Sequence, residues 1–561
     1  MTEKGEKMSK FIIQGGKKLE GEIKISGSKN AALPIIAATV LNAGTTTLYN
    51  VPDIQDVNTM FEILKKIGAT IKRKNNKIII NTNKVHTYEI PDDLMRQMRS
   101  SVILAGALIG KYHKAKFSCP GGCDIGSRPI DLHLKGFEKL GVDIKEEYGE
   151  IYCNTEKIVG TQIHLDLPSV GATENIILAS CLGEGTTVIT NAAREPEIED
   201  MIKYLNKMGA KINGAGTDKV EIIGVKRLAE VSYNIMPDRI EAGTYLVAGA
   251  ITSGDIKILN VNSFHIEPIL NKLEETNCKL NINKDEIEII APKRVKSVDI
   301  KTMPYPGFPT DMQSIFGALL ITAKGTSVIT ENIFESRYKY AQELIRMGAK
   351  INVEGRTAII KGTKKIQGTN VVATDLRGGA ALVMAGLYAK GITQIDNIHY
   401  ILRGYEKIDE KLKKLGVHLN SKRQKFFSED QGYTSMHFSI ESSVLPNWIS
   451  ELQDRSSSIE YLSIHGHDAL PGKKRKLLNL PSNLNKAISK KYVKSLNNIS
   501  PNYTIYRFNG YIERYNMKKN VHHYYSNLLV KEPIYTKKLD SILDNKKTTP
   551  FLPNSDIDID R

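Results

Sequence analysis

The chain has 561 residues, more than one hydrophobic core normally organises, so two or more domains are expected. Hydrophobic residues make up 41% of it and charged residues 25%, which is the ordinary composition of a soluble globular protein. The first residues are charged and lack an apolar core, and no stretch approaches the roughly 18 apolar residues of a membrane span. We therefore expect neither an export signal nor contact with a membrane.

The five cysteines are odd in number and irregularly spaced, which predicts free thiols in a reducing, cytoplasmic compartment. Cys119 and Cys123 are spaced as CxxxC, but no further ligands follow them, so no metal site is expected. The formal net charge is +16, and half of that excess lies in residues 421–561. Nucleic acid, a membrane surface or anionic metabolites could each explain such a charge.

One pattern of about 70 residues recurs six times between residues 1 and 420. Each copy has a β-rich run, an Asn or equivalent near its end, an amphipathic stretch, then a Gly-Ala or similar pair and another strand. The closing pairs begin at residues 68, 141, 209, 277, 348 and 416. Six α/β units therefore fill this region, and three units per domain is the natural division because single cores rarely exceed about 250 residues.

Two helices are expected in each unit. The amphipathic one is clearest at 60–68, where Met60, Ile63, Leu64 and Ile67 recur at helical spacing and Gly68 is typical of a helix C-cap. Short strands such as 77–81 and 220–223 flank these helices. The other helix is apolar nearly all round and therefore buried. It is expected at 30–41, 94–110, 172–182, 240–251, 311–323 and 377–389.

The run from Cys119 to His133, CPGGCDIGSRPIDLH, carries the most distinctive chemistry of the chain. Its glycines allow backbone conformations in which amide groups point at a bound anion. That environment and the Arg128 guanidinium would lower the pKa of the Cys123 thiol. A buried structural cysteine is the alternative, but the glycines, Arg128 and Asp131 together favour a reactive thiol.

Cations stand at the starts of several predicted helices. Lys29 and Asn30 open the first buried helix, where a lysine is unfavourable to the helix dipole and therefore suggests an anionic ligand. Further arginines lie in turns or beside glycines, and arginine is suited to bidentate contact with carboxylate and phosphate. They are Arg96, Arg99, Arg337, Arg377 and Arg403.

Asp311 begins the buried helix predicted at 311–323, a position that by itself is typical of a plain N-cap. Taken with the cations and the thiol, it supplies a carboxylate to a possible reaction centre. The combination predicts a small substrate that carries both a phosphate and a carboxylate.

The runs SGSKNAALP, DLMRQMRSS, PGGCDIGSRPIDLHL, SVGAT, NAAREPEIED, MPDRIEAGTYLVA, FPTDMQ, TDLRGGAALV and RGYEKI closely resemble the bacterial enolpyruvyl transferases of peptidoglycan synthesis. The resemblance covers about residues 8–420. It implies an α/β fold, a two-domain inside-out α/β barrel, with crossings near 24–29 and 236–241. One domain would be residues 29–236, and the other would combine residues 1–28 with 237–420.

The resemblance implies transfer of enolpyruvyl from phosphoenolpyruvate to the 3′-hydroxyl of UDP-N-acetylglucosamine, with release of phosphate, as the first committed step of peptidoglycan synthesis. It implies no metal and no organic cofactor. Cys123 would be the general acid and form an adduct with phosphoenolpyruvate, Asp311 the base, and Asp375 an acid near the reacting centre.

The family's binding residues also carry over by position. Lys29, Arg128 and Arg403 would hold the phosphate of phosphoenolpyruvate, Arg337 and Arg377 its carboxylate, and Asn30 would line the same site. The nucleotide sugar would contact Asp311 and a set of pocket residues. These are Arg99, Arg128, Pro129, Ile130, Asp131, Leu132, Ser169, Val170, Gly171 and Ile333.

The chain departs from the family pattern before its last arginine, where many members have His-Ile-Asp-Arg-Gly-Tyr-Glu and this chain has Leu402 in place of the acid. Leu402 cannot pair with or orient Arg403. Two other functions stay open: the sister enolpyruvyl transferase of the shikimate pathway, and a non-catalytic or regulatory paralogue. The cysteine in the Gly-Gly-Cys run argues against the shikimate enzyme.

Residues 421–561 form a basic C-terminal extension that resembles nothing we recognise. It contains the single tryptophan, Trp448, the basic run 473–476 and the run 522–525, and residues 443–452 could form short helices. A flexible appendage or a small fused domain is favoured over a nucleic-acid-binding segment, because basic runs are usually solvated.

Overall fold

The computed structural model describes residues 6–42, 44–74, 77–120 and 130–425, together with six strands beyond residue 432. The chain divides into two units, of which one spans Met8–Lys422 and the other combines Met1–Lys7 with Arg423–Arg561. No helix in the described part is long and apolar enough to cross a membrane.

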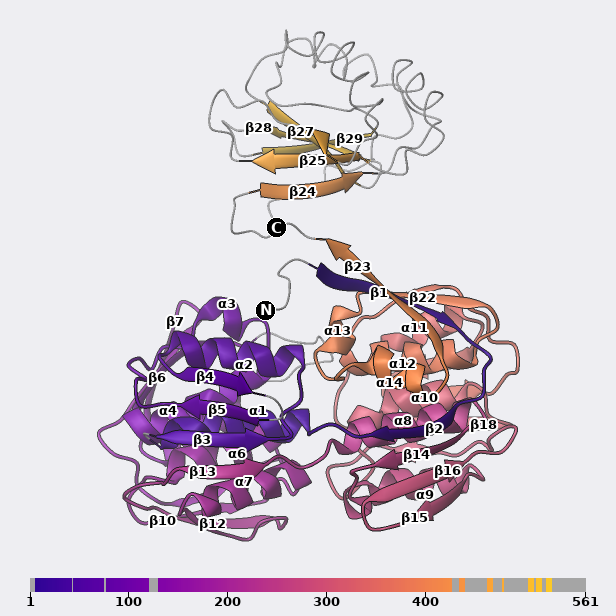
Figure 1. Ribbon diagram of the computed structural model, residues 1–561. Helices are drawn as coiled ribbons and strands as arrows, with labels where there is room; N and C mark the ends of the chain where they lie inside the picture. The colour runs from indigo at the N-terminus through magenta and orange to yellow at the C-terminus, as the bar shows by residue number, and fades with distance from the viewer. Residues whose placement is uncertain are drawn as a thin grey trace. The chain divides into compact units, whose positions relative to one another are not determined.

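Six small sheets form the outer parts of the Met8–Lys422 unit, one for each repeat predicted from the sequence (Figure 1). In four of them, two antiparallel pairings are extended by a parallel strand, and a fifth contains one antiparallel and one parallel pairing beside a further strand. The strand orders are β13-β3-β5-β4 (Val231–Asn234, Thr45–Tyr49, Lys77–Asn81, Thr70–Lys74), β6-β8-β7 (Lys114–Ser118, Glu150–Asn154, Asp143–Glu147), β11-β12-β10-β9 (Lys211–Asn213, Lys219–Ile223, Thr186–Thr190, Gln162–His164), β15-β16-β14-β2 (Lys279–Ile282, Glu286–Ile290, Asp255–Leu259, Glu20–Lys24), β17-β18-β20-β19 (Ile300–Lys301, Thr326–Thr330, Thr357–Lys361, Lys350–Glu354) and β21-β22-β1-β23 (Asn370–Val372, Ile392–Asp396, Glu6–Gln14, His418–Lys425).

The apolar helices pack against one another behind these sheets. They are α1 (Lys29–Ala38), α4 (Ile103–Tyr112), α6 (Val170–Ser180), α8 (Arg239–Ile251), α10 (Gln313–Leu320) and α12 (Leu376–Tyr388). Helix α4 packs on α1 and α6, and α12 packs on α8 and α10. Helices without a polar face must be enclosed on all sides, and here three of them enclose one another in each group.

The amphipathic helices lie between the apolar helices and solvent. They are α2 (Gln55–Lys66), α5 (Asp131–Lys139), α7 (Pro196–Lys207), α9 (Glu267–Glu275), α11 (Tyr340–Arg346) and α14 (Ile408–Lys414). Each is followed by a left-handed residue at the predicted closing position. Five of these residues are glycines, with φ between 90° and 114°, and the sixth is Asn277 at φ 69°. The helix ends predicted from the repeat are therefore confirmed.

The helix predicted at 94–110 is wrong at its beginning. Helix α3 (Asp92–Met95) ends early, Met98 is extended, a 3-10 turn (η2, Arg99–Val102) follows, and α4 begins only at Ile103. The Ser101 hydroxyl donates to the carbonyls of Met95 and Met98, which replaces the helical partners of those carbonyls. The helix predicted at 311–323 likewise begins as a 3-10 turn (η4, Thr310–Met312) and ends at Leu320.

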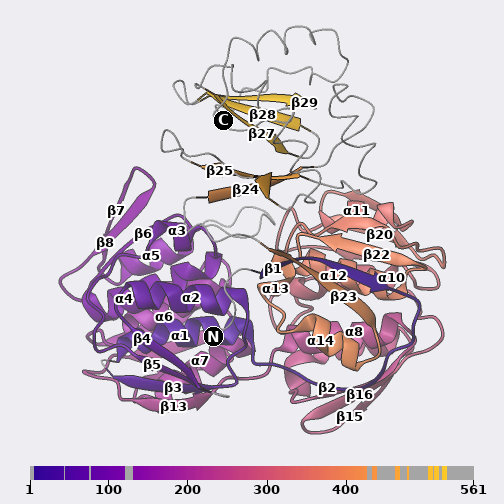
Figure 2. The same ribbon diagram turned by 45° about the horizontal axis from the view of Figure 1, so that its top comes forward.

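The buried hydrophobic residues form two separate clusters. One contains residues between Ala31 and Met236, and the other combines residues from Phe11 to Ile25 with residues from Ile240 to Leu419. Figure 2 shows the corresponding elements gathered into two bodies, with β1 and β2 running along the second. Each cluster is built from three of the six repeats.

The chain passes between the two clusters at two neighbouring places. Gly27 and Pro237 form an isolated antiparallel bridge, the amide of Ser28 donates to the carbonyl of Met236 at 2.7 Å, and the amide of Asp238 donates to the carbonyl of Ser26 at 2.9 Å. A Cβ on Gly27 would lie 1.7 Å from the carbonyl oxygen of Asn50, so only glycine fits there.

Asp200 forms hydrogen bonds at the second of these crossings, and its burial predicts how the stability of the protein depends on pH. Its carboxylate accepts from the Tyr233 hydroxyl at 2.8 Å and the Met236 amide at 3.2 Å, and burial raises its pKa to about 6 despite those bonds. Because the folded state favours the neutral form, the free energy of unfolding should fall by up to about 3 kcal/mol as pH rises from 3.8 to about 6. Urea unfolding at several pH values would measure this slope.

Asp200→Asn should flatten that slope, whereas Asp166→Asn, at an exposed acid, should leave it unchanged. An unaltered slope in Asp200→Asn would contradict the assignment.

The second unit contains six described strands in two antiparallel sheets. The sheets are β24-β25-β26 (Tyr433–Phe438, Leu462–His467, Leu477–Leu478) and β27-β28-β29 (Tyr503–Phe508, Tyr511–Asn516, Val521–Ser526). Residues 522–525 lie on β29, whereas Trp448, residues 443–452 and the basic run 473–476 lie outside the described residues.

Candidate active site

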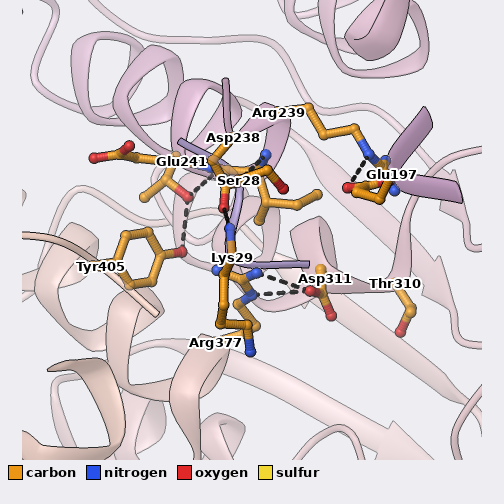
Figure 3. A network of polar contacts seen from close by, with 12 residues as sticks. Ser28, Lys29, Glu197, Asp238, Arg239, Glu241, Thr310, Asp311, Arg377 and Tyr405 are labelled. Carbon is orange, nitrogen blue, oxygen red and sulfur yellow. Dashed lines mark hydrogen bonds and ion pairs between the residues drawn. The ribbon is translucent and has the colours of Figure 1, made fainter. Parts of the chain in front are cut away.

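The N-terminal ends of four apolar helices gather residues of opposite charge in one place (Figure 3). Lys29 and Arg239 are the first residues of α1 and α8, Arg377 is the second residue of α12, and Asp311 lies in the turn η4 that leads into α10. The N-terminus of a helix carries unsatisfied N–H groups and a partial positive charge. The arrangement therefore suits an anionic ligand.

Lys29 is held in place by the backbone of this junction. Ser28 caps α1, and the Lys29 amide donates to Asp238 Oδ2 at 3.1 Å. The other oxygen of Asp238 caps α8 by accepting from the amides of Ile240 and Glu241. One carboxylate thus joins the starts of two helices, one from each hydrophobic cluster. The predicted position of Lys29 and Asn30 at a helix N-terminus is confirmed.

Asp311 lies between two buried arginines. Arg337 Nη2 donates to Asp311 Oδ1 at 2.7 Å, while Arg377 donates to Oδ2 from Nε at 3.1 Å and from Nη2 at 2.9 Å. Burial alone would raise the pKa of Asp311, but Arg377, Arg337 and Lys29 outweigh it and hold the pKa well below its usual range. Asp311 caps no helix, so the N-cap alternative is wrong.

Each of these two arginines has one buried N–H donor that no described residue accepts. Arg337 Nε and Arg377 Nη1 are buried, and neither has a hydrogen-bond acceptor among the described residues. Arg377 also lies over the Tyr405 ring, 5.3 Å from its centroid, and the Tyr405 hydroxyl bonds Thr244 at 2.9 Å. Because buried donors are normally satisfied, this pair is equipped to bind a further acceptor such as a second carboxylate.

A second cluster of charges lies beside the first. Asp56 accepts from Lys29 Nζ at 3.3 Å and from Arg403 Nε at 2.8 Å. The Asp56 side chain is only 3% exposed. Arg403 follows α13 (His399–Leu402), and Leu402 packs against the hydrophobic cluster that ends at Leu419. The acid that the family pattern places before Arg403 is thus absent. Asp56, on a helix of the Ala31–Met236 cluster, pairs with this arginine instead.

The remaining predicted residues near Asp311 have structural partners. Asp375 is the N-cap of α12 and accepts from the amides of Arg377 and Gly378 at 3.0 and 2.9 Å. It therefore fixes the start of the helix that carries Arg377. The amide of Ile333 donates to Glu331, whose other carboxylate oxygen accepts from Thr310, the neighbour of Asp311. Ile333 is in this way tied to the turn η4.

Two predicted pocket segments meet at the starts of α5 and α6. Ser169 caps α6, and a Cβ on Gly171 would lie 2.9 Å from Cε1 of His133 on α5. His133 Nδ1 in turn bonds Asn175 of α6 at 2.7 Å. This contact brings residues 130–132 beside residues 169–171.

Three of the predicted residues cannot be placed, because they lie outside the described part of the chain. They are Cys123, Arg128 and Pro129. Arg99 begins the turn η2. Arg96 is exposed and pairs with Asp92 on its own helix at 2.8 Å, as an ordinary surface charge does.

Three charged residues of this region were not predicted from the sequence. Asp56 follows the start of an amphipathic helix, where an acid is expected for the helix dipole alone. Glu197 and Arg239 form a buried pair at 2.9 Å, with Arg239 lying 5.6 Å from the centroid of the Tyr305 ring. Both lie within quoted motifs, but their spacing of 42 residues gave no sign that they meet.

The described cysteines are free thiols. Cys153 and Cys181 are buried, and burial raises the pKa of each to about 12. Among the described residues, no group of His, Cys, Asp and Glu side chains could hold a metal ion.

The comparisons with known proteins fit this geometry. A family model described as EPSP synthase (3-phosphoshikimate 1-carboxyvinyltransferase) matches residues 13–412. The enolpyruvyl transferase NikO from Streptomyces tendae superposes with a TM-score of 0.67 at 24% identity, over 75% of this chain and all of NikO. An EPSP synthase from Acinetobacter baumannii superposes at 0.60 and 19% identity, over 74% of this chain and all of its own. The predicted enolpyruvyl transferase fold is confirmed, and the chain is of the carboxyvinyltransferase class.

Curated relatives define the family within that class. The UDP-N-acetylglucosamine 1-carboxyvinyltransferase 2 of Caldanaerobacter subterraneus subsp. tengcongensis is 54% identical over 73% of this chain and 99% of its own length. The UDP-N-acetylglucosamine 1-carboxyvinyltransferase of Geobacter metallireducens is 48% identical over 73% of this chain and 98% of its own. The chain belongs to this family, as the motifs predicted.

Proposed function

We propose that the protein transfers enolpyruvyl from phosphoenolpyruvate to the 3′-hydroxyl of UDP-N-acetylglucosamine and releases phosphate, as the first committed step of peptidoglycan synthesis. The relatives that carry the corresponding name match it over nearly their whole length. The observation that carries the proposal is the cluster of buried cations with unused donors at Arg337 and Arg377. Such a cluster suits a substrate with two anionic groups.

In this proposal different cations bind the two anionic groups of phosphoenolpyruvate. Lys29 and Arg403, with Arg128, hold the phosphate, while Arg337 and Arg377 hold the carboxylate. Asn30 lines the same site. Cys123 gives a proton to the methylene carbon as the 3′-hydroxyl oxygen adds to the adjacent carbon, which yields a tetrahedral ketal. The Cys123 thiolate then takes a proton back from the new methyl group, which expels phosphate and restores the double bond.

Asp311 accepts the proton of the 3′-hydroxyl in this scheme. Its pKa is held low while Arg337 and Arg377 bind it, which makes it a weak base in the free protein. A substrate carboxylate that draws these guanidinium groups toward itself would raise the pKa of Asp311. The base would thus become stronger only after phosphoenolpyruvate has bound.

The nucleotide sugar is assigned to the pocket formed by residues 130–132 and 169–171, with Arg99, Arg128, Pro129 and Ile333. The proximity of the two pocket segments at His133 and Gly171 supports this assignment. Asp375 is assigned a place near the reacting centre, where it fixes the start of the helix that carries Arg377. We further propose that the two hydrophobic clusters are two lobes, residues 29–236 and residues 1–28 with 237–420, and that residues 421–561 are a separate extension.

A phosphate-release assay tests the proposed reaction directly. The protein is incubated with phosphoenolpyruvate and either UDP-N-acetylglucosamine or shikimate 3-phosphate, with phosphoenolpyruvate alone as the control. Release that depends on UDP-N-acetylglucosamine is expected. Release with shikimate 3-phosphate alone would assign the chain to the sister activity, and no release with either acceptor would indicate a non-catalytic paralogue.

Cys123 gives a second, independent prediction. An epoxide that mimics phosphoenolpyruvate should add one mass increment to the protein at Cys123, and faster when UDP-N-acetylglucosamine is present. Peptide mass spectrometry locates the increment. The buried thiols of Cys153 and Cys181 should stay unmodified, because a thiol of pKa about 12 is almost entirely protonated at neutral pH. Modification elsewhere, or none, would count against Cys123 as the reactive thiol.

A further inference from the structure

We propose that Asp56 is an internal counter-ion that binds the phosphate-holding cations in the free protein and releases them when phosphate arrives. The inference rests on the proposed function in one respect, the assignment of Lys29 and Arg403 to the phosphate of phosphoenolpyruvate. It concerns a residue outside the set predicted from the sequence.

Both oxygens of Asp56 are engaged by these two cations. Oδ1 accepts from Arg403 Nε at 2.8 Å, while Oδ2 accepts from Lys29 Nζ at 3.3 Å and lies 3.5 Å from Arg403 Nη2. The three side chains are 3%, 12% and 11% exposed for Asp56, Lys29 and Arg403. One carboxylate is thus shared by two cations in a largely dry setting.

The sharing of one carboxylate by two cations defines what can displace Asp56. A phosphate group carries up to two negative charges and several acceptor oxygens, so it can satisfy both cations more fully than one carboxylate does. The exchange still has a cost, because the bonds to Asp56 must first break. Asp56 therefore lowers the affinity for any single weak anion and favours a strongly charged one.

The same contact joins the two hydrophobic clusters. Asp56 lies on α2, within the cluster that spans Ala31 to Met236, whereas Arg403 belongs to the segment that follows α13. A second bond lies beside it, since Glu406 Oε1 accepts from the amide of Asp53 at 2.9 Å. Residues 403–406 thus contact residues 53–56.

Leu402 makes this contact more important in the present chain. With no acid next to Arg403 in the sequence, the orientation of its guanidinium depends on carboxylates supplied from elsewhere, and Asp56 is one.

The test is the affinity of the full chain for inorganic phosphate, measured by calorimetry. Asp56→Asn keeps the shape of the side chain but removes its charge, so phosphate should bind about tenfold more tightly or better. Glu62→Gln is the matched control, because Glu62 lies on the same helix, is 55% exposed and pairs only locally with Lys65. It should leave phosphate affinity unchanged. Equal or weaker binding by a folded Asp56→Asn variant would overturn the proposal.

A crystal structure of the unmodified chain with inorganic phosphate gives a readout that needs no variant. Phosphate on Lys29 and Arg403 with both contacts to Asp56 broken is the expected result. Phosphate bound while Asp56 keeps both cations would overturn the inference, as would phosphate bound away from them. Neither measurement requires turnover, so absence of activity with both acceptors would reject the proposed function while leaving this inference standing on its own result.

Discussion

Replacing Asp311 with asparagine is expected to slow turnover by about 10²- to 10⁴-fold, the usual contribution of a general base. Asparagine keeps an acceptor oxygen for Arg337 and Arg377 but cannot take the proton of the 3′-hydroxyl. Because the side chain is nearly isosteric and is 28% exposed, the fold should survive. Steady-state phosphate release gives kcat and KM, and circular dichroism reports the fold.

Asp166→Asn serves as the control, since Asp166 is an exposed acid paired with Lys135. It should keep full activity. If Asp311→Asn kept full turnover as well, another group would have to be the base.

The pH profiles of the unmodified protein carry a further sign of this role. The pKa of free Asp311 lies well below 3.8, so kcat/KM should show no acid limb from this group above about pH 4. Once substrate has drawn the arginines away, the pKa of Asp311 rises. As the pH is lowered, kcat should therefore begin to fall at a higher pH than kcat/KM does. Coincident acid limbs would show that the arginines stay on Asp311.

Replacing Arg377 with methionine is expected to cost about 3–5 kcal/mol of stability, the usual effect of removing one member of a buried ion pair. Arg377 is 2% exposed and donates two of the three hydrogen bonds that Asp311 accepts from the arginines. Its removal leaves the carboxylate with Arg337 alone and leaves the Tyr405 ring without its cation. Urea unfolding at neutral pH measures the loss.

Arg356→Met provides the comparison, because Arg356 forms an exposed pair with Glu335 and such pairs contribute about 0–1 kcal/mol. In the unmodified chain the benefit of ionised Asp311 should be full above pH 3.8 and be lost as the pH falls below it, since its folded-state pKa is lowered. Equal losses in the two variants would show that Arg377 acts as a surface charge does.

The repeat was the part of the fold most readable from sequence. A left-handed residue at a helix end is most often glycine or asparagine, so the closing positions from Gly68 to Gly416 marked six helix ends without any tertiary information. The six apolar helices were equally visible, because no solvated helix lacks a polar face. The break near Met98 was not visible, since it depends on a serine hydroxyl competing for backbone carbonyls.

The candidate site was only half predictable. Single cations at helix starts, such as Lys29 and Arg377, stood out because their positions are locally unfavourable. Their partners did not, because Asp56 and Arg403 are separated by 347 residues and Asp311 and Arg377 by 66. An acid in the first turn of a helix is ordinary, and only the tertiary structure shows which cation it meets.

The position of β1 and β2 bears on how the chain folds during synthesis. These strands are made before the cluster from Ala31 to Met236, yet they pair with β22 and β14, which are made after it. At translation rates of about 5–20 residues per second, β2 waits roughly ten seconds to a minute for its partner. The cluster from Ala31 to Met236 can close in that interval, while the leading strands remain unpaired and available to ribosome-associated chaperones.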